Sequence, residues 1–191
     1  MAIVINGSGT VTGLAVGGLP DGTVDAGTLA TDSVTAAKLE VSAITHSDLP
    51  AGSVLQVVQS IQTTYVNTTS TSFGDTGLAA TITPKFSSSK IMVVINAHGL
   101  AQNGGGAKAE LALHRGSILA YYLRPIFVGS GATFATGSCA INYLDSPNNT
   151  SANVYKLQIR NRGSSDSVRF NDFHTGSERS SSSITLMEIA G

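Results

Sequence analysis

The chain of 191 residues has no tryptophan, a single cysteine, and charge on only 12 % of its residues. One cysteine excludes a framework of intrachain disulfides, and the small and apolar neighbours of Cys139 predict a buried, unreactive thiol. The charged fraction is about half the usual value of about 25 %, which is typical of β-rich surfaces that partner chains partly cover. The formal net charge of −1 argues against a nucleic-acid-binding protein, which would carry a basic excess.

Long apolar runs are absent as well. The longest run of large apolar residues, 91–95, is too short to span a bilayer, so we expect no membrane insertion. The N-terminal sequence MAIVINGSGT lacks the basic region and the long apolar core of a secretory signal. We therefore expect a protein that is made in a cytoplasm and is then soluble or assembled.

A ladder of large apolar residues recurs at every fifth position near the N-terminus. Five steps turn an α-helix by about 500°, so successive members form no stripe, and five steps along a strand reverse the face each time. One chain cannot bury such a ladder, whereas several copies wound around one axis can. We interpret residues 20–53 as an intertwined stalk, with three chains as the expected number. Its predicted core is Val24, Leu29, Val34, Leu39, Ile44 and Leu49.

Two further segments flank the stalk. Residues 1–19 form a strand–turn–strand arm that is too short to fold alone, and we expect it to pair with something larger. After residue 53, strand-like runs alternate with turn sequences at intervals near ten residues, which predicts an all-β head, an antiparallel sandwich of jelly-roll type, over residues 54–191. The expected strands are 53–66, 77–84, 90–101, 107–116, 117–125, 132–145, 153–162, 167–172 and 182–190.

The sequence holds no motif for catalysis or for a cofactor. The glycine-rich turns lack the spacing of dinucleotide and phosphate loops, and the four histidines stand singly, so we expect no metal site within one chain. A three-histidine site made by His46 on a trimer axis stays open, against a solvated polar position. The carboxylates Asp75 and Asp145 look like ordinary turn residues. A pair of carboxylates for glycoside hydrolysis need not be close in sequence, but we expect no enzyme.

Several phrases of the sequence resemble virion-associated fibre proteins of tailed bacteriophages, those of aquatic bacteria and cyanobacteria above all. The resemblance implies a homotrimer with an N-terminal virion anchor, a short shaft and a β-sandwich head similar in shape to the C1q and tumour-necrosis-factor heads. It also implies contact with other virion proteins, of the tail, baseplate or capsid, and with a host surface glycan or protein. The phrases are INGSGTVTGLAVGGLPDGTVDAGTLA, ATDSVTAAKLE, FGDTGLAATITPKFSSSKIMV, YLDSPNNTSANVYKLQIRN and SSITLMEIAG.

The sequence thus predicts a virion fibre whose head recognises the host surface. The alternative is a purely structural head-fibre, collar or decoration protein without a receptor of its own. Long connections offer the most surface for recognition, and two of them supply the candidate receptor-binding residues, although Phe173 also fits a core position at a strand end. The candidates are Gln102, Asn103, Asn171, Asp172, Phe173 and His174.

Overall fold

The computed structural model describes residues 4–5, 11–12, 29, 31, 34–35, 39, 44–123, 134–163, 166–172 and 179–191. The chain divides into two units, residues 1–45 and residues 46–191. In the first unit, β1 (Val4–Ile5) pairs antiparallel with β2 (Val11–Thr12). The ladder position Val24 lies outside the described residues.

Residues 46–191 begin with a short 3₁₀ turn, η2 (His46–Asp48), and then form two antiparallel sheets, which confirms the predicted all-β sandwich. In the part of the chain that the structure describes, no helix is long and apolar enough to cross a membrane. The four-stranded sheet has the order β5 (Gly74–Ile82), β10 (Asn153–Asn161), β7 (Ala109–Arg115), β8 (Ile118–Leu123). The six-stranded sheet contains β3 (Val54–Gln62), β12 (Ser182–Ile189), β6 (Lys90–Asn103), β11 (Ser167–Phe170), β4 (Val66–Thr68) and β9 (Phe134–Asp145).

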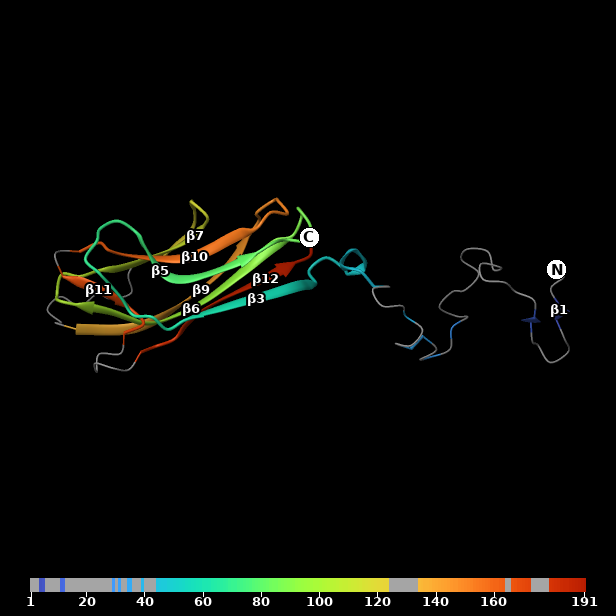
Figure 1. Cartoon of the computed structure of the whole chain (residues 1–191), viewed down its shortest axis with the longest axis horizontal. Coiled ribbons are helices and arrows are strands. Elements are labelled where there is room, and N and C mark those ends of the chain that lie inside the picture. The colour runs from blue at the N-terminus through green and yellow to red at the C-terminus, as the bar shows by residue number, and fades with distance from the viewer. Residues whose placement is uncertain are drawn as a thin grey trace. The chain divides into compact units, whose positions relative to one another are not determined.

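Strand β6 organises the larger sheet. Its first half pairs with β12 and its second half with β11, while β9 runs along its other edge. At about 3.3 Å per residue, its 14 residues extend roughly 45 Å. Lys90 lies opposite Ile189, which in turn lies opposite Val54, and we call this the proximal end of the head. The other end of β6, where Asn103 lies opposite Ser167, is the distal end; Figure 1 shows β11 there, far from the C-terminus.

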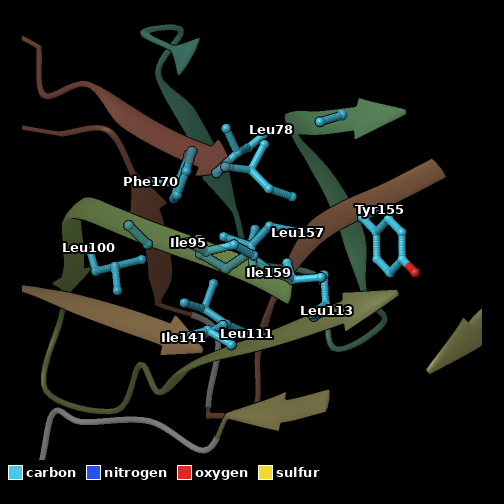
Figure 2. Close-up of a cluster of buried hydrophobic side chains, with 14 of the residues drawn as sticks. Leu78, Ile95, Leu100, Leu111, Leu113, Ile141, Tyr155, Leu157, Ile159 and Phe170 are labelled. Atoms are coloured by element: carbon cyan, nitrogen blue, oxygen red, sulfur yellow. The ribbon is translucent and has the colours of Figure 1, made fainter. Parts of the chain in front are cut away.

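The core fills the space between the two sheets because every second residue of each strand points inward. Strand β10 shows this alternation: Tyr155, Leu157 and Ile159 are buried, whereas the residues between them are at least partly exposed. Figure 2 shows these side chains packed with aliphatic residues of β6, β7 and β9. Each fully buried aliphatic side chain contributes about 1.5–3 kcal/mol relative to exposure, so the sandwich rests on this single core.

The structure corrects two expectations about strand ends and turns. The predicted strand 53–66 is broken into β3 and β4, because the side chain of Gln62 accepts the N–H of Thr64 and Asn171 donates to the carbonyl oxygens of both residues. The two carboxylates that the sequence predicts to be ordinary turn residues lie elsewhere. Asp75 lies within β5, and Asp145 is buried at the end of β9, where it pairs with Arg115 at 2.7 Å.

A bulge in β6 depends on a glycine. The register with β9 shifts between Ala97 and Leu100, and Gly99 in this bulge has a φ of +57°. A Cβ at this position would lie 2.3 Å from the backbone oxygen of Asp172 and 2.6 Å from its nitrogen. The bulge therefore brings two backbone segments into a contact that only glycine permits.

We expect Gly99→Ala to be strongly destabilising, and Gly116→Ala provides its control. Gly116 has nearly the same φ, +59°, but a Cβ there would meet nothing within 4 Å. Both substitutions carry the cost of a left-handed backbone, about 1–2 kcal/mol, and only Gly99→Ala adds a backbone clash. Chemical denaturation should show that Gly99→Ala lowers the free energy of unfolding by about 2 kcal/mol more than Gly116→Ala. Equal losses would contradict the close approach.

Candidate functional site

The outer side of the six-stranded sheet is an exposed apolar surface, which we call the apolar face. Val57 of β3 lies opposite Met187, Met187 opposite Met92, and Met92 opposite Leu144, so an apolar row crosses four strands. The exposed fractions of Val57 and Leu144 are 58 % and 50 %. The apolar face comprises Val54, Val57, Ile61, Met92, Val94, Leu144, Met187 and Ile189.

Charge is nearly absent from the part of this side that the apolar face occupies. Over the described parts of β3, β12, β6 and β9, the outward positions include one lysine, Lys90, and no carboxylate. A solvent-facing side of an antiparallel sheet is ordinarily polar, and large exposed apolar patches on soluble proteins mark interaction sites. The apolar face therefore has the composition of a surface that another protein surface covers.

The described ladder positions are exposed too. Their exposed fractions range from 38 % for Leu49 to 61 % for Ile44, and the other three are Leu29, Val34 and Leu39. All five side chains are thus exposed in the single chain, and their burial in a stalk stays a prediction. His46 is likewise exposed.

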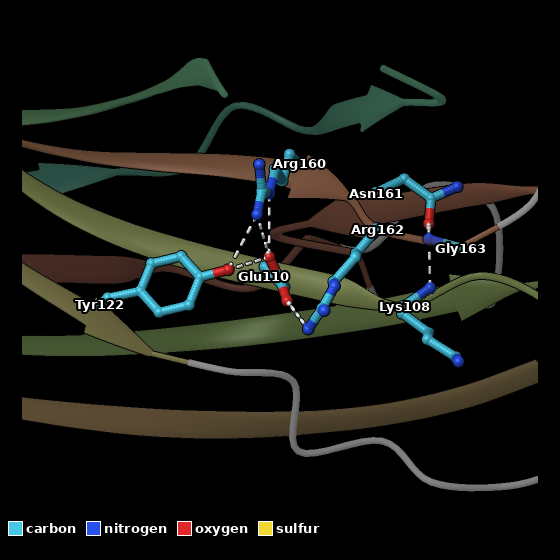
Figure 3. A network of polar contacts seen from close by, with 7 residues as sticks. All are labelled: Lys108, Glu110, Tyr122, Arg160, Asn161, Arg162 and Gly163. Carbon is cyan, nitrogen blue, oxygen red and sulfur yellow. Dashed lines mark hydrogen bonds and ion pairs between the residues drawn. The ribbon is translucent and has the colours of Figure 1, made fainter. Parts of the chain in front are cut away.

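The outer side of the four-stranded sheet is instead polar, and it holds a fully buried carboxylate. Glu110 of β7 lies opposite Arg160 of β10. Arg160 donates to the Glu110 carboxylate at 2.8 Å and to the Tyr122 hydroxyl at 2.9 Å, and Arg162 donates to the other carboxylate oxygen at 3.2 Å. The Tyr122 hydroxyl also donates to Glu110. Figure 3 shows that both guanidinium groups and the phenol converge on this one carboxylate.

Aromatic contacts cover the same region. Phe73, just before β5, meets Tyr122 edge-to-face at 5.9 Å between ring centroids, and the Arg160 guanidinium lies 4.4 Å from the centre of the Phe73 ring. Ala112 lies directly opposite Tyr122 on this side of the sheet, yet it is fully buried beneath the larger side chains. Burial also lowers the pKa of His114, whose ring Phe73 contacts. The cluster is thus packed and ordered although it faces outward.

The ionised form of Glu110 is favoured despite its burial. Burial acts to raise the pKa of Glu110, but the hydrogen bonds from Tyr122 and Arg160 and the charge of Arg160 outweigh it and hold the pKa below the ordinary value of 4.5. The stability that this charge contributes is complete above the unfolded pKa and is lost as the pH falls through the lower folded pKa.

We therefore expect Glu110→Gln to destabilise the protein at pH 7 and not at low pH. Since both arginines are partly exposed, the loss at pH 7 should be modest, about 1–2 kcal/mol in the free energy of unfolding. The difference between the wild type and Glu110→Gln should shrink below about pH 4.5, the ordinary pKa. Chemical denaturation at a series of pH values measures this, and a difference that does not change with pH would refute it.

The structure separates the six candidate receptor-binding residues. Gln102 and Asn171 are buried, with exposed fractions of 1 % and 0 %, and Asp172 is 5 % exposed and pairs with Arg169 at 2.9 Å. Asn171 serves the fold, because it accepts a hydrogen bond from the Ser182 hydroxyl and donates to two backbone oxygens. Asn103 is exposed at the distal end, and residues 173–174 lie outside the described residues.

The remaining sequence-based expectations concern reactive groups. Cys139 is half-buried, and burial raises the pKa of its thiol to about 11, as expected for an unreactive cysteine. Within the described ranges, no group of three or more histidine, cysteine, aspartate or glutamate side chains is placed to hold a metal ion.

The cluster around Glu110 was not predicted from the sequence. Its signal is a lone carboxylate among small and apolar residues in AKAELALHR, together with the outward cations of KLQIRNR. The pairing itself depends on the register of β7 and β10, which joins residues 50 positions apart.

Comparisons with known proteins identify no family. Neither protein-family models nor curated proteins match the sequence. One similar structure, of Bacillus endospore appendages described as a novel family of disulfide-linked pili, has 13 % identity and a TM-score of 0.28 over 73 % of this chain and 94 % of that chain. Another, of infectious bursal disease virus, has 13 % identity and a TM-score of 0.29 over 73 % of this chain and 39 % of that chain. Such low scores support no functional argument; the structure itself establishes an antiparallel β-sandwich over residues 46–191.

Proposed function

We propose that this chain is the subunit of a short homotrimeric fibre on a tailed bacteriophage. Residues 1–19 attach the fibre to the virion, residues 20–53 form the intertwined stalk, and residues 54–191 form a head that contacts the host surface. The observation that supports this most is the exposure of large apolar side chains in two consecutive parts of one chain, the ladder and the apolar face.

Copies of the same chain are the partner that accounts for the ladder. A ladder with five-residue spacing presents one apolar side chain per step, and an axis shared by parallel chains buries every step at once. Full burial of a valine, leucine or isoleucine side chain contributes about 1.5–3 kcal/mol. Burial of five exposed rungs in each of three chains therefore favours assembly of the stalk, against the conformational entropy that its ordering costs.

The same partner accounts for the apolar face. A surface without carboxylates and with a single lysine can pack against copies of itself with little charge repulsion. Val54 continues the five-residue phase of the ladder and also begins β3, whose outward residues belong to the apolar face. Chains that are held together along the ladder therefore enter the head at the edge of this face.

Trimerisation through the apolar face leaves the distal end and the outer side of the four-stranded sheet for the host. Three heads on each fibre, and several fibres on each particle, raise the avidity of a weak individual site. This multivalency is the mechanism we propose for attachment.

Two measurements test the proposal. Light scattering of the whole chain should give three times the chain mass of 19.5 kDa, and a monomer would refute the fibre. The isolated head should then compete with virions for adsorption to host cells. A trimer that is incorporated into virions but does not compete would support the alternative, a purely structural fibre, collar or decoration protein.

A further inference from the structure

We propose that the cluster of Arg160, Arg162, Tyr122 and Glu110 binds a carboxylate-bearing sugar of a host-surface polysaccharide. This inference rests on the proposed function in one respect, because the outer side of the four-stranded sheet must face outward in the assembly. The side chains of this site belong to β7, β8 and β10 and the residue that follows β10, so that a rigid sheet holds them.

Stability alone does not account for this cluster. The core lies on the other side of the sheet, and a buried charged group contributes little net stability compared with well-packed apolar residues. What Glu110 does is hold two guanidinium groups and a phenol in fixed positions, since each of them bonds to its carboxylate. Groups fixed before the ligand arrives lose little conformational entropy on binding.

The site has hydrogen-bond donors and positive charge that can bind an anionic ligand. Arg162 has a side chain that is 52 % exposed, and its described contact with Glu110 uses one of five N–H donors. Its backbone N–H donates to the Lys108 carbonyl at 2.9 Å, which places the exposed Lys108 directly beside it. Three cations against the single carboxylate of Glu110 give the site a net charge of 3 − 1 = +2. Guanidinium groups bind carboxylates through paired hydrogen bonds.

The aromatic part of the site indicates a sugar and not a bare anion. Tyr122 and Phe73 are both partly exposed, and they contact each other and Arg160. Partly exposed rings offer an apolar surface on which the C–H side of a sugar ring can pack, while the guanidinium groups take the carboxylate. An acidic sugar satisfies both parts of the site at once.

Calorimetric titration of the full-length protein with trigalacturonate at low salt tests this site. We expect Arg162→Gln to weaken binding at least tenfold, while the neutral trisaccharide maltotriose should bind at least tenfold more weakly than trigalacturonate. The matched control is Lys85→Gln, which removes the same charge from an exposed position in the connection between β5 and β6 and should change the affinity less than twofold.

Three outcomes would overturn the assignment: no binding of trigalacturonate by the wild type at millimolar concentration, an equal loss in Lys85→Gln, or tighter binding of glucose 6-phosphate than of trigalacturonate. An equal loss in the control variant would mean that the positive charge of the protein attracts polyanions in general. Tighter binding of glucose 6-phosphate would mean that the site prefers a phosphate group. Light scattering on the same samples separates this test from that of the fibre. A monomer whose binding depends on Arg162 would support the binding site and refute the fibre. A trimer that binds no trigalacturonate would refute the binding site and leave the fibre standing.

Discussion

With Val57→Asp and Leu144→Asp together, residues 54–191 should be a monomer, while the same fragment of the wild type should be a trimer. Both side chains are at least half exposed in the single chain, so the substitutions should leave the sandwich folded. In a trimer they lie in the proposed interface, where each unpaired buried charge costs several kcal/mol and is repeated in three chains. Light scattering gives the mass, and circular dichroism verifies that the strands persist.

The control for this prediction places the same two charges on the other sheet. Leu119 and Val154 lie on the four-stranded sheet and are 51 % and 41 % exposed. Leu119→Asp together with Val154→Asp should leave the mass of the fragment unchanged. A wild-type fragment that is itself a soluble, folded monomer would show that the stalk alone holds the chains together, and a trimeric Val57→Asp/Leu144→Asp variant would exclude the apolar face.

The second large effect is expected in the stalk of the full-length chain. Leu29→Asp together with Val34→Asp places three copies of two charges on the shared axis, which should separate the three chains over the stalk. The backbone amides of the described ladder residues should then exchange with solvent at least 100-fold faster than in the wild type. Because the heads can hold the trimer on their own, the mass of this variant is a separate measurement, and local hydrogen exchange is the decisive one.

Off-ladder positions provide the comparison in the stalk. Thr31 and Thr35 are exposed and lie between the rungs, so Thr31→Asp together with Thr35→Asp adds the same charge away from the axis. Exchange in this variant should stay close to that of the wild type. If the wild-type ladder amides already exchange as in an unfolded chain, the rungs are not buried and the intertwined stalk is wrong.

Strands such as β10 were predictable because apolar and polar residues alternate in them with a period of two. In β10, Val154, Lys156, Gln158 and Arg160 alternate with the buried residues, and this pattern alone fixes which side faces the core. Local periodicity contains no information on a break such as that between β3 and β4. That break depends on hydrogen bonds from Asn171, more than 100 residues away in the sequence.

The polar contacts could not be predicted for the same reason. Asp145 precedes Ser-Pro-Asn-Asn, a typical turn sequence, but its carboxylate is buried by Tyr155, whose hydroxyl donates to it at 2.7 Å. The receptor-binding residues were chosen for their polar side chains in apparent loops. Gln102 lies within β6 instead, and a bulge and a backbone contact bury Asn171 and Asp172. Sequence indicates polarity, whereas strand register decides which polar groups meet.

The pairing of β3 with β12 determines how the proposed head would carry mechanical load. At the proximal end, the N–H of Gly52 donates to Ala190 and the N–H of Ala190 donates to Ser53, so the two strands are joined where tension from the stalk would enter. A receptor bound toward the distal end would pull nearly parallel to β3, and the hydrogen bonds between antiparallel strands lie perpendicular to that direction. Tension would therefore load all the hydrogen bonds between β3 and β12, from Val54 to Gln62, in shear at the same time, instead of breaking them one after another.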